Sequence, residues 1–239
     1  MADSGFARRA RPLLGTLVEL GLPASQSDRA ELAWRAVERV QRCMSRFDAD
    51  SDIARYNAAP ARSRIDVRPC TARVLRAARE MERCSRGVFD VSLGTGAWSL
   101  DGLVLIKHHD GGLIDLGGIA KGEAVDLAVR ALRGAGVTAG WVNAGGDLRV
   151  FGDIDLPVLL RNEDHGGATP WMRIGDGALA TSHYAPGSRS QLHGRIAQAH
   201  VSVAAPSCRL ADALTKIVAA TGDTRHPLLK DHGAQAWLH

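Results

Sequence analysis

The residues best suited to chemistry lie in the stretch IDLGGIAKGEAVD, residues 114–126. Gly117 and Gly118 directly precede a helical pattern, and Lys121 falls in its first turn. A glycine pair lets the backbone approach a ligand closely, and the free N–H groups and dipole of a helix N-terminus attract an anion. Because a lysine is unfavourable at that end of the dipole, we expect Lys121 to meet a negatively charged ligand. An ordinary strand–turn–helix with an exposed lysine is the other interpretation.

A second glycine pair, in the sequence AGGD at residues 144–147, follows the expected helix. The apolar run at 137–143 favours a β-strand, and residues 148–152 favour a returning strand. Two strands joined by a short glycine-rich segment are typical of a β-hairpin. We therefore expect a tight turn at this second glycine pair.

The composition limits the classes of function. Of the 239 residues, 45% are hydrophobic and 23% are charged, an ordinary globular composition with room for a sizeable core. The net charge of +4 suits an anionic small molecule. Only 5% of residues are aromatic, and no basic run is interleaved with aromatic residues, so we expect no nucleic acid partner.

No apolar stretch is long enough to span a bilayer, so we expect no membrane partner and a cytoplasmic location. Arg8 and Arg9 ahead of an apolar run resemble a twin-arginine signal, but Glu19 interrupts that run. The four cysteines are scattered and lack the spacing of a metal site. This usage is typical of free, partly buried thiols in a reducing compartment.

The remaining pattern mixes helices with short strands. We expect further strands at 13–22, 156–161, 178–181, 201–204 and 235–238, and helices at 29–43, after Ser51, at 71–85, from 119 onward and at 208–219. Several strand pairs read as hairpins, which favours an α+β fold with mixed, largely antiparallel sheets flanked by helices over a doubly wound parallel sheet.

Taken in order, these stretches resemble the FAD:protein FMN transferase (ApbE) family. The LLGT sequence resembles the family's M-G-T, with Leu14 in place of Met, and similar matches follow at 44–57, 87–90, 114–126, 142–152, 178–182 and 210–216. The stretch at 114–126 is similar to the family's I-D-L-G-G-[IV]-A-K-G core almost letter for letter. Because the resemblance runs from about residue 12 to 238, we expect residues 1–239 to form a single domain of this kind.

The resemblance implies an enzyme that binds FAD and, with Mg²⁺, cleaves its pyrophosphate. FMN would pass to a threonine hydroxyl of a partner flavoprotein, and AMP would be released. A diphosphate agrees with the residue pattern, since it is the kind of anion that glycines, a helix N-terminus and Lys121 would hold. A non-transferring FAD-binding flavoprotein and an FAD pyrophosphatase without an acceptor are the alternatives.

The resemblance also implies the residues that contact FAD. They are Leu14, Phe47, Val88, Phe89, Asp90, Asp115, Gly117, Lys121, Asn143, Gly145 and Gly146. Asp115 and Lys121 could instead serve in an intrachain salt bridge.

The metal ligands implied are the carbonyl oxygen of Gly118, the acid Asp212, which also counts among the catalytic residues, and a threonine. The family has that threonine four residues after the acid, where this chain has Lys216, and Thr215 stands one place early. We expect Asp212 and Thr215 to bind Mg²⁺. Alternatively, Lys216 places its ammonium where the ion would lie and holds Asp212 without metal.

The general base is the other point of departure from the family. The family's later motif carries a histidine proposed as the base, and here that motif is compressed to residues 190–195 with no histidine at the matching place. His183 and His193 are the candidates to replace it, because histidine titrates near neutrality. For each, a histidine in an ordinary polar loop is the plain alternative.

Overall fold

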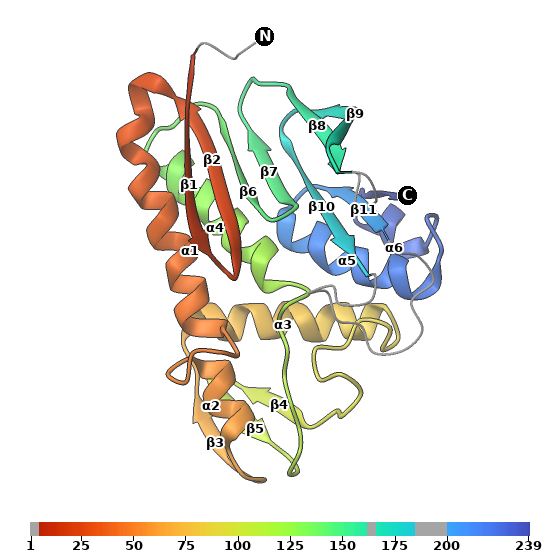
Figure 1. Ribbon diagram of the computed structural model, residues 1–239. Coiled ribbons are helices and arrows are strands. Elements are labelled where there is room, and N and C mark those ends of the chain that lie inside the picture. Colours follow the sequence, from red (N-terminus) through yellow and green to blue (C-terminus); the bar gives the residue numbers. More distant parts are fainter. Residues whose placement is uncertain (1–4, 162–165, 185–199) are drawn as a thin grey trace.

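The computed structural model of the chain describes residues 5–161, 166–184 and 200–239. Within this part, seven strands form the main sheet in the order β1-β2-β6-β7-β10-β11-β12, and every neighbouring pair is antiparallel (Figure 1). The strands are β1 (Phe6–Leu13), β2 (Thr16–Pro23), β6 (Gly140–Ala144), β7 (Asp147–Phe151), β10 (Gly177–His183), β11 (His200–Ala205) and β12 (Gln235–Leu238). This architecture confirms the predicted α+β class.

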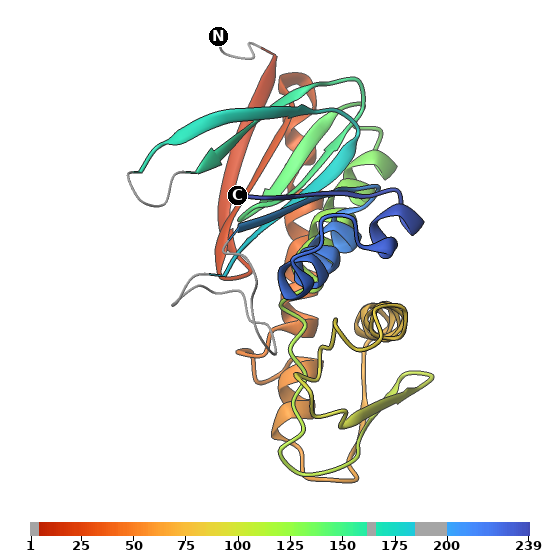
Figure 2. The same cartoon turned by 90° about the vertical axis from the view of Figure 1, so that its right-hand side faces the viewer.

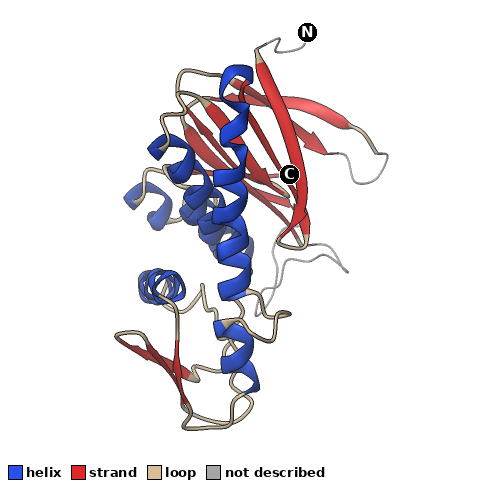
Figure 3. Cartoon of the chain, turned by 90° about the vertical axis from the view of Figure 1, so that its left-hand side faces the viewer, coloured by secondary structure: helices blue, strands red, loops and turns tan. Residues whose placement is uncertain are grey.

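Helices cover one face of the main sheet, and a hairpin lies over the other (Figures 2 and 3). The helices on that face are α1 (Ala30–Met44), α4 (Ala120–Gly134) and α5 (Cys208–Thr221), with the 3₁₀ turn η1 (Ala24–Arg29) before α1. The hairpin consists of β8 (Leu156–Arg161) and β9 (Ala168–Ile174).

The remaining elements lie beyond one end of the main sheet or beside its last strand (Figure 1). They are α2 (Asp52–Ala58), α3 (Pro69–Cys84), the small sheet of β3 (Arg64–Asp66), β5 (Val104–Lys107) and β4 (Trp98–Asp101), and α6 (Pro227–Asp231). Ser51 caps α2 as expected, since its hydroxyl accepts the N–H of Ala54 at 3.0 Å.

The strand expected at 13–22 is present as β2 but begins later, at Thr16, and the strand β1, which was not expected, precedes it in a hairpin. Leu14 and Gly15 form its two-residue turn, with φ angles of 55° and 69°. Two successive residues with positive φ match the twist of a tight hairpin. The predicted start of the strand was wrong because leucine rarely adopts this conformation. Strand β1 was missed because its arginine-rich sequence lacks an alternating apolar pattern.

Other expectations can be compared with the described residues directly. The four cysteines carry free thiols, as predicted. Strand β9 was not expected, because its residues are largely exposed and show no clear alternation. None of the helices in the described ranges combines the length and apolar character needed to cross a membrane.

Helix α4 has the apolar spacing that predicted it. Ala124, Val125, Ala128 and Leu132 are fully buried, and the helix packs against β6 and β7 as well as against α1 and α5. Burial of this stripe anchors the helix. The N-terminus of α4 is thereby held beside the turn between β6 and β7.

Candidate functional site

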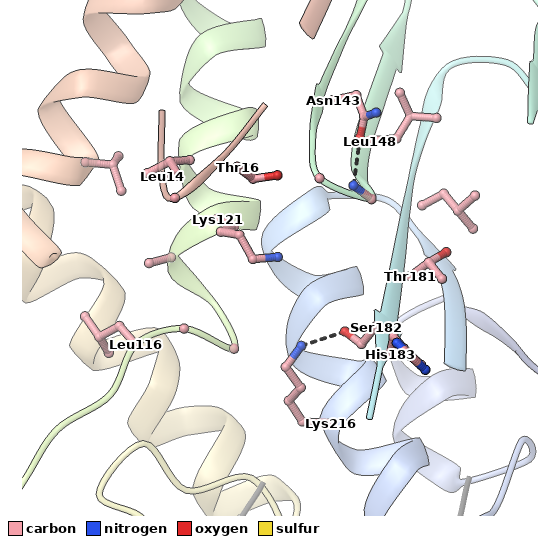
Figure 4. A pocket seen from close by; sticks show the side chains of 18 of the residues that line it. Leu14, Thr16, Leu116, Lys121, Asn143, Leu148, Thr181, Ser182, His183 and Lys216 are labelled. Carbon is pink, nitrogen blue, oxygen red and sulfur yellow. Dashed lines mark hydrogen bonds between the residues drawn. The ribbon is translucent and has the colours of Figure 1, made fainter. Parts of the chain in front are cut away.

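A cavity of about 1770 Å³ opens at the N-terminus of α4 (Figure 4). The residues expected at the site that line it are Leu14, Phe47, Phe89, Asp90, Asp115, Gly117, Gly118, Lys121, Asn143, Gly145, Gly146 and His183. Val88 does not line the cavity, because it packs against the hydrophobic core. Asp212 and Thr215 are fully buried behind Lys216, which does line it. His193 lies outside the described residues.

Most backbone donors at the start of α4 already have partners. The N–H of Gly117 donates to Asp115 Oδ1 at 2.7 Å, and those of Ile119 and Ala120 donate to the Leu116 carbonyl at 3.0 and 2.8 Å. The expectation that free N–H groups hold an anion here is therefore wrong for these three groups. For Gly117 the physical reason is local, because an aspartate two residues before a donor readily closes a turn with its own side chain. The N–H groups of Ile119 and Ala120 are used in the turn that leads into the helix.

Asp115 pairs with Arg46. The distance from Arg46 Nη1 to Asp115 Oδ2 is 3.1 Å, and the Arg46 guanidinium lies 4.7 Å from the centroid of the Phe47 ring. The Phe47 side chain is 85% exposed, at the rim of the cavity. The intrachain salt bridge considered for Asp115 is thus present, and it holds together the loop after α1 and the glycine turn.

Lys121 forms the second expected salt bridge, with Asp147. Lys121 Nζ lies 2.5 Å from Asp147 Oδ2; the lysine side chain is 30% exposed, whereas the carboxylate is fully buried. Burial and the charge of Asp212 raise the pKa of Asp147 to about 6, although Lys121 opposes this. Burial alone would lower the pKa of Lys121, but the charges of Asp147 and Asp212 raise it. An ammonium therefore faces the cavity.

The turn of the second glycine pair positions Asp147. Asn143 Oδ1 accepts the N–H of Gly146 at 3.1 Å, and the Gly146 carbonyl accepts the N–H of Thr181 at 3.0 Å. Gly145 and Gly146 have φ angles of 61° and 101°, a region that glycine adopts without strain. The three residues expected here thus shape the turn that carries the carboxylate toward Lys121.

Close packing of α4 on α5 brings a second charged pair, Asp212 and Lys216 of α5, next to the start of α4. A Cβ atom at Gly122 would lie 2.4 Å from the Cys208 carbonyl oxygen, so only glycine allows this approach. The Asp126 carboxylate accepts the N–H groups of Cys208 and Arg209, both at 2.9 Å, and so caps α5 from α4. The first turns of α5 are thereby fixed against the start of α4.

Lys216 lies at the centre of the residues expected to bind metal. Its Nζ is 2.8 Å from Asp212 Oδ1, 2.8 Å from Ser182 Oγ and 3.0 Å from Thr215 Oγ1 (Figure 4 shows the contact with Ser182). A Cβ at Gly118 would meet the Lys216 side chain at 3.0 Å. The side chain is 6% exposed.

These residues do not fit a Mg²⁺ ion in this arrangement. Asp212 directs one oxygen to the Lys216 ammonium, and its other oxygen accepts the N–H of Gly122 at 3.4 Å. The Thr215 hydroxyl contacts the same ammonium and donates to the Asp212 carbonyl at 2.7 Å. The contacts agree with the alternative in which Lys216 holds Asp212.

His183 lies at the end of β10 with its ring stacked on that of His200. The ring centroids are 4.1 Å apart and the planes differ by 12°. Successive side chains of a strand point to opposite faces, so Ser182 faces α5 while His183 faces the side of β8. His183 lines the cavity, but its side chain projects from the face of the sheet opposite to the face on which α5 and Lys216 lie. Its role as a base remains a prediction.

Several cavity residues were not expected. The apolar wall comes from the sheet face beneath the β8–β9 hairpin and includes Trp141, Leu148 and Leu179, three members of one buried cluster. The alternation of residue types along β6, β7 and β10 in the sequence could have indicated this second apolar face of the sheet. Asp147 is the last residue of the AGGD sequence, but no function was predicted for it. Nothing local to Arg46 indicated its pairing with Asp115.

Comparisons with known proteins agree with this geometry. The ApbE family model matches residues 14–102 and 95–185, most of the chain. An FAD:protein FMN transferase of Rhodobacter capsulatus is 27% identical over 177 residues, which cover 59% of this chain and 34% of that protein. The chain thus matches about a third of this curated relative.

Solved structures of the family share the fold. The flavin transferase ApbE of Vibrio cholerae superposes with a TM-score of 0.83 at 20% identity, covering 98% of this chain and 93% of that one. The ApbE protein of Thermotoga maritima gives a TM-score of 0.83 at 21% identity, with coverages of 98% and 94%. With the family model matching more than half of its residues, this chain belongs to the ApbE family.

Proposed function

We propose that this chain is an FAD:protein FMN transferase, which cleaves FAD, releases AMP and transfers FMN to a threonine hydroxyl of a partner flavoprotein. Membership of the ApbE family and the name of the Rhodobacter relative support this assignment. The observation that carries it is the Lys121 ammonium, which Asp147 holds at 2.5 Å while the side chain stays 30% exposed to a cavity of about 1770 Å³.

The two sides of the cavity match the two kinds of surface on FAD. The apolar wall of Trp141, Leu148 and Leu179 suits a flat aromatic ring system. The side chains of Lys121 and Lys216 line the opposite side, and the ammonium group of each lies beside a carboxylate. A dinucleotide presents rings joined by a diphosphate, so it can use both surfaces at once.

The reaction is a phosphoryl transfer in which this chain mainly positions groups and balances charge. The acceptor hydroxyl oxygen forms a bond to the phosphorus of the FMN half. The bond from that phosphorus to the bridging oxygen breaks, and AMP leaves with the electron pair. Lys121 offsets the growing charge on the phosphate oxygens. The hydroxyl proton passes to a base, for which His183 is the described candidate.

The test combines the protein, FAD and the flavin-free form of a flavoprotein that carries FMN on a threonine. Chromatography measures AMP and free FMN, and mass spectrometry of the acceptor locates the flavin. AMP together with FMN on the acceptor threonine is the expected result. AMP with free FMN alone would show an FAD pyrophosphatase. FAD retained without AMP would show a flavin-binding protein, and either result would overturn the proposal. An acceptor with valine in place of the threonine is the control.

A further inference from the structure

The position of Lys216 is unusual for a lysine. Its ammonium is nearly enclosed, yet the side chain borders the cavity beside Gly118. Long cationic side chains normally extend their charged end into water. Here the Nζ contacts a carboxylate oxygen of Asp212 and the hydroxyl oxygens of Ser182 and Thr215.

Three contacts use all the donors that the ammonium has. A lysine carries three N–H groups, and the three acceptors lie at 2.8, 2.8 and 3.0 Å. Oxygen ligands of these kinds, a carboxylate and two hydroxyls, are also what a hard divalent cation binds. The positive charge among these three oxygen atoms is therefore supplied by a side chain of the protein itself.

The surroundings hold the ammonium in place from several elements. Ser182 comes from β10, and Asp212 and Thr215 come from α5. The Gly118 backbone, in the turn before α4, lies close to the aliphatic part of the Lys216 side chain. The Ser182 and Thr215 hydroxyls also bond to each other at 2.9 Å. An ammonium held by side chains from two different elements keeps its charge at one point, as a bound ion does.

We propose that the Lys216 ammonium takes the place of a divalent cation in this chain, so that cleavage of FAD requires no added metal. This inference rests on the proposed function for its effect on catalysis, but not for its prediction about metal binding. Lys216 supplies one positive charge where an ion would supply two, and Lys121 supplies a second from the start of α4.

The bond changes are those of the proposed transfer. As the bond between the FMN phosphorus and the bridging oxygen breaks, negative charge grows on the phosphate oxygens. A fixed ammonium stabilises that charge without reorganising, because its partners already hold it. Lys216 gives up no proton in this step; the proton of the acceptor hydroxyl goes to the base.

The experiment compares the wild-type protein with Lys216→Thr, which places a hydroxyl four residues after Asp212 and removes the ammonium. Binding of Mn²⁺, used alone as the probe, is measured by electron paramagnetic resonance without FAD. FAD cleavage is measured with EDTA and with added Mg²⁺. Lys230→Thr changes an exposed lysine on α6 that does not line the cavity, and serves as the matched control.

We expect wild type and Lys230→Thr to bind no Mn²⁺ and to cleave FAD equally well with EDTA and with Mg²⁺. Lys216→Thr should bind Mn²⁺, and its rate should fall by about 10- to 100-fold in EDTA and recover with Mg²⁺. Wild-type protein that binds Mn²⁺, or that loses its activity in EDTA, would overturn the inference.

Two features keep the result decisive. The wild-type Mn²⁺ titration needs no variant, so it tests the inference even if Lys216→Thr fails to fold, which circular dichroism detects. If wild-type protein cleaves no FAD under any condition, the proposed function fails. The Mn²⁺ titrations then still decide whether Lys216 excludes a metal ion.

Discussion

Two lysine–aspartate pairs meet at the floor of the cavity, and they differ in which atoms remain available. In the first pair, Lys121 is 30% exposed and its partner Asp147 is fully buried. In the second, Lys216 is 6% exposed and Asp212 is fully buried. Asp147 keeps one buried oxygen without a hydrogen-bond partner, whereas both oxygens of Asp212 accept hydrogen bonds.

The carboxylates respond to these surroundings in opposite directions. Burial raises the pKa of Asp147, and the single lysine contact does not compensate. Burial acts on Asp212 too, but the charges of Lys216 and Lys121 outweigh it and lower the pKa. Lys121 and Asp147 thus form an open pair, which can exchange partners with a ligand. Lys216 and Asp212 form a closed pair, which acts as one fixed unit.

The largest expected effect comes from breaking the closed pair with Lys216→Met. The variant leaves the Asp212 carboxylate buried without its cation, so the free energy of unfolding should fall by about 3–5 kcal/mol. Urea denaturation measures it. The double variant Asp212→Asn with Lys216→Met removes both charges and should recover most of the loss. An equal loss in the single and double variants would contradict the idea of a closed pair.

The open pair should matter for the ligand more than for the fold. Lys121→Met removes the ammonium that faces the cavity, and kcat/KM for FAD cleavage should fall by about 100-fold. The loss of stability should be smaller than for Lys216→Met, because water can reach this side chain's position. Lys230→Met is the control for removal of a lysine charge. Unchanged kcat/KM in Lys121→Met would remove the main support for the diphosphate site.

The same contrast explains what the sequence could predict. Helix α4, the β6–β7 hairpin and α5 follow from local apolar spacing and paired glycines, and each was expected close to its observed limits. The turn at Leu14 was missed because its conformation is rare for leucine. Such a turn depends on strand pairing along β1 and β2 and not on the propensity of its residues.

For the site, residue types were easier to predict than partners. Lys121 was expected to meet an anion, and the structure pairs it with Asp147, whose position depends on the turn that follows β6. The contacts of Lys216 depend on the approach of α5 to α4 across Gly122, which no single stretch encodes. Local pattern thus identified the residues, whereas packing between distant elements decided their contacts.

The raised pKa of Asp147 predicts that the free energy of unfolding depends on pH through the open pair and not through the closed pair. Its pKa is about 6 in the folded chain against 3.8 as the ordinary value, so the folded state binds the extra proton between these limits. Stability from this group is complete below pH about 4 and is lost as the pH rises through about 6, a loss on the order of 3 kcal/mol.

Asp147→Asn provides the measurement for this pH effect. Urea unfolding of wild type and variant between pH 4 and pH 7 isolates the group, since other titrations contribute to both proteins. The difference in unfolding free energy between the two proteins should change across that window. A constant difference would show that Asp147 is ionised throughout, as Asp212 is expected to be.

The smallest effect is expected at the rim, away from both pairs. Phe47→Ser removes an 85% exposed ring beside Arg46, so the free energy of unfolding should change by less than about 0.5 kcal/mol. If the ring covers bound FAD, KM should rise about 3-fold, equivalent to about 0.7 kcal/mol, with kcat unchanged. Leu103→Ser, at an exposed leucine outside the cavity, is the matched control. A fall in kcat would contradict this prediction. It would show that Phe47 affects the reaction step, as the lysines of the cavity floor are expected to, and does not only contact FAD.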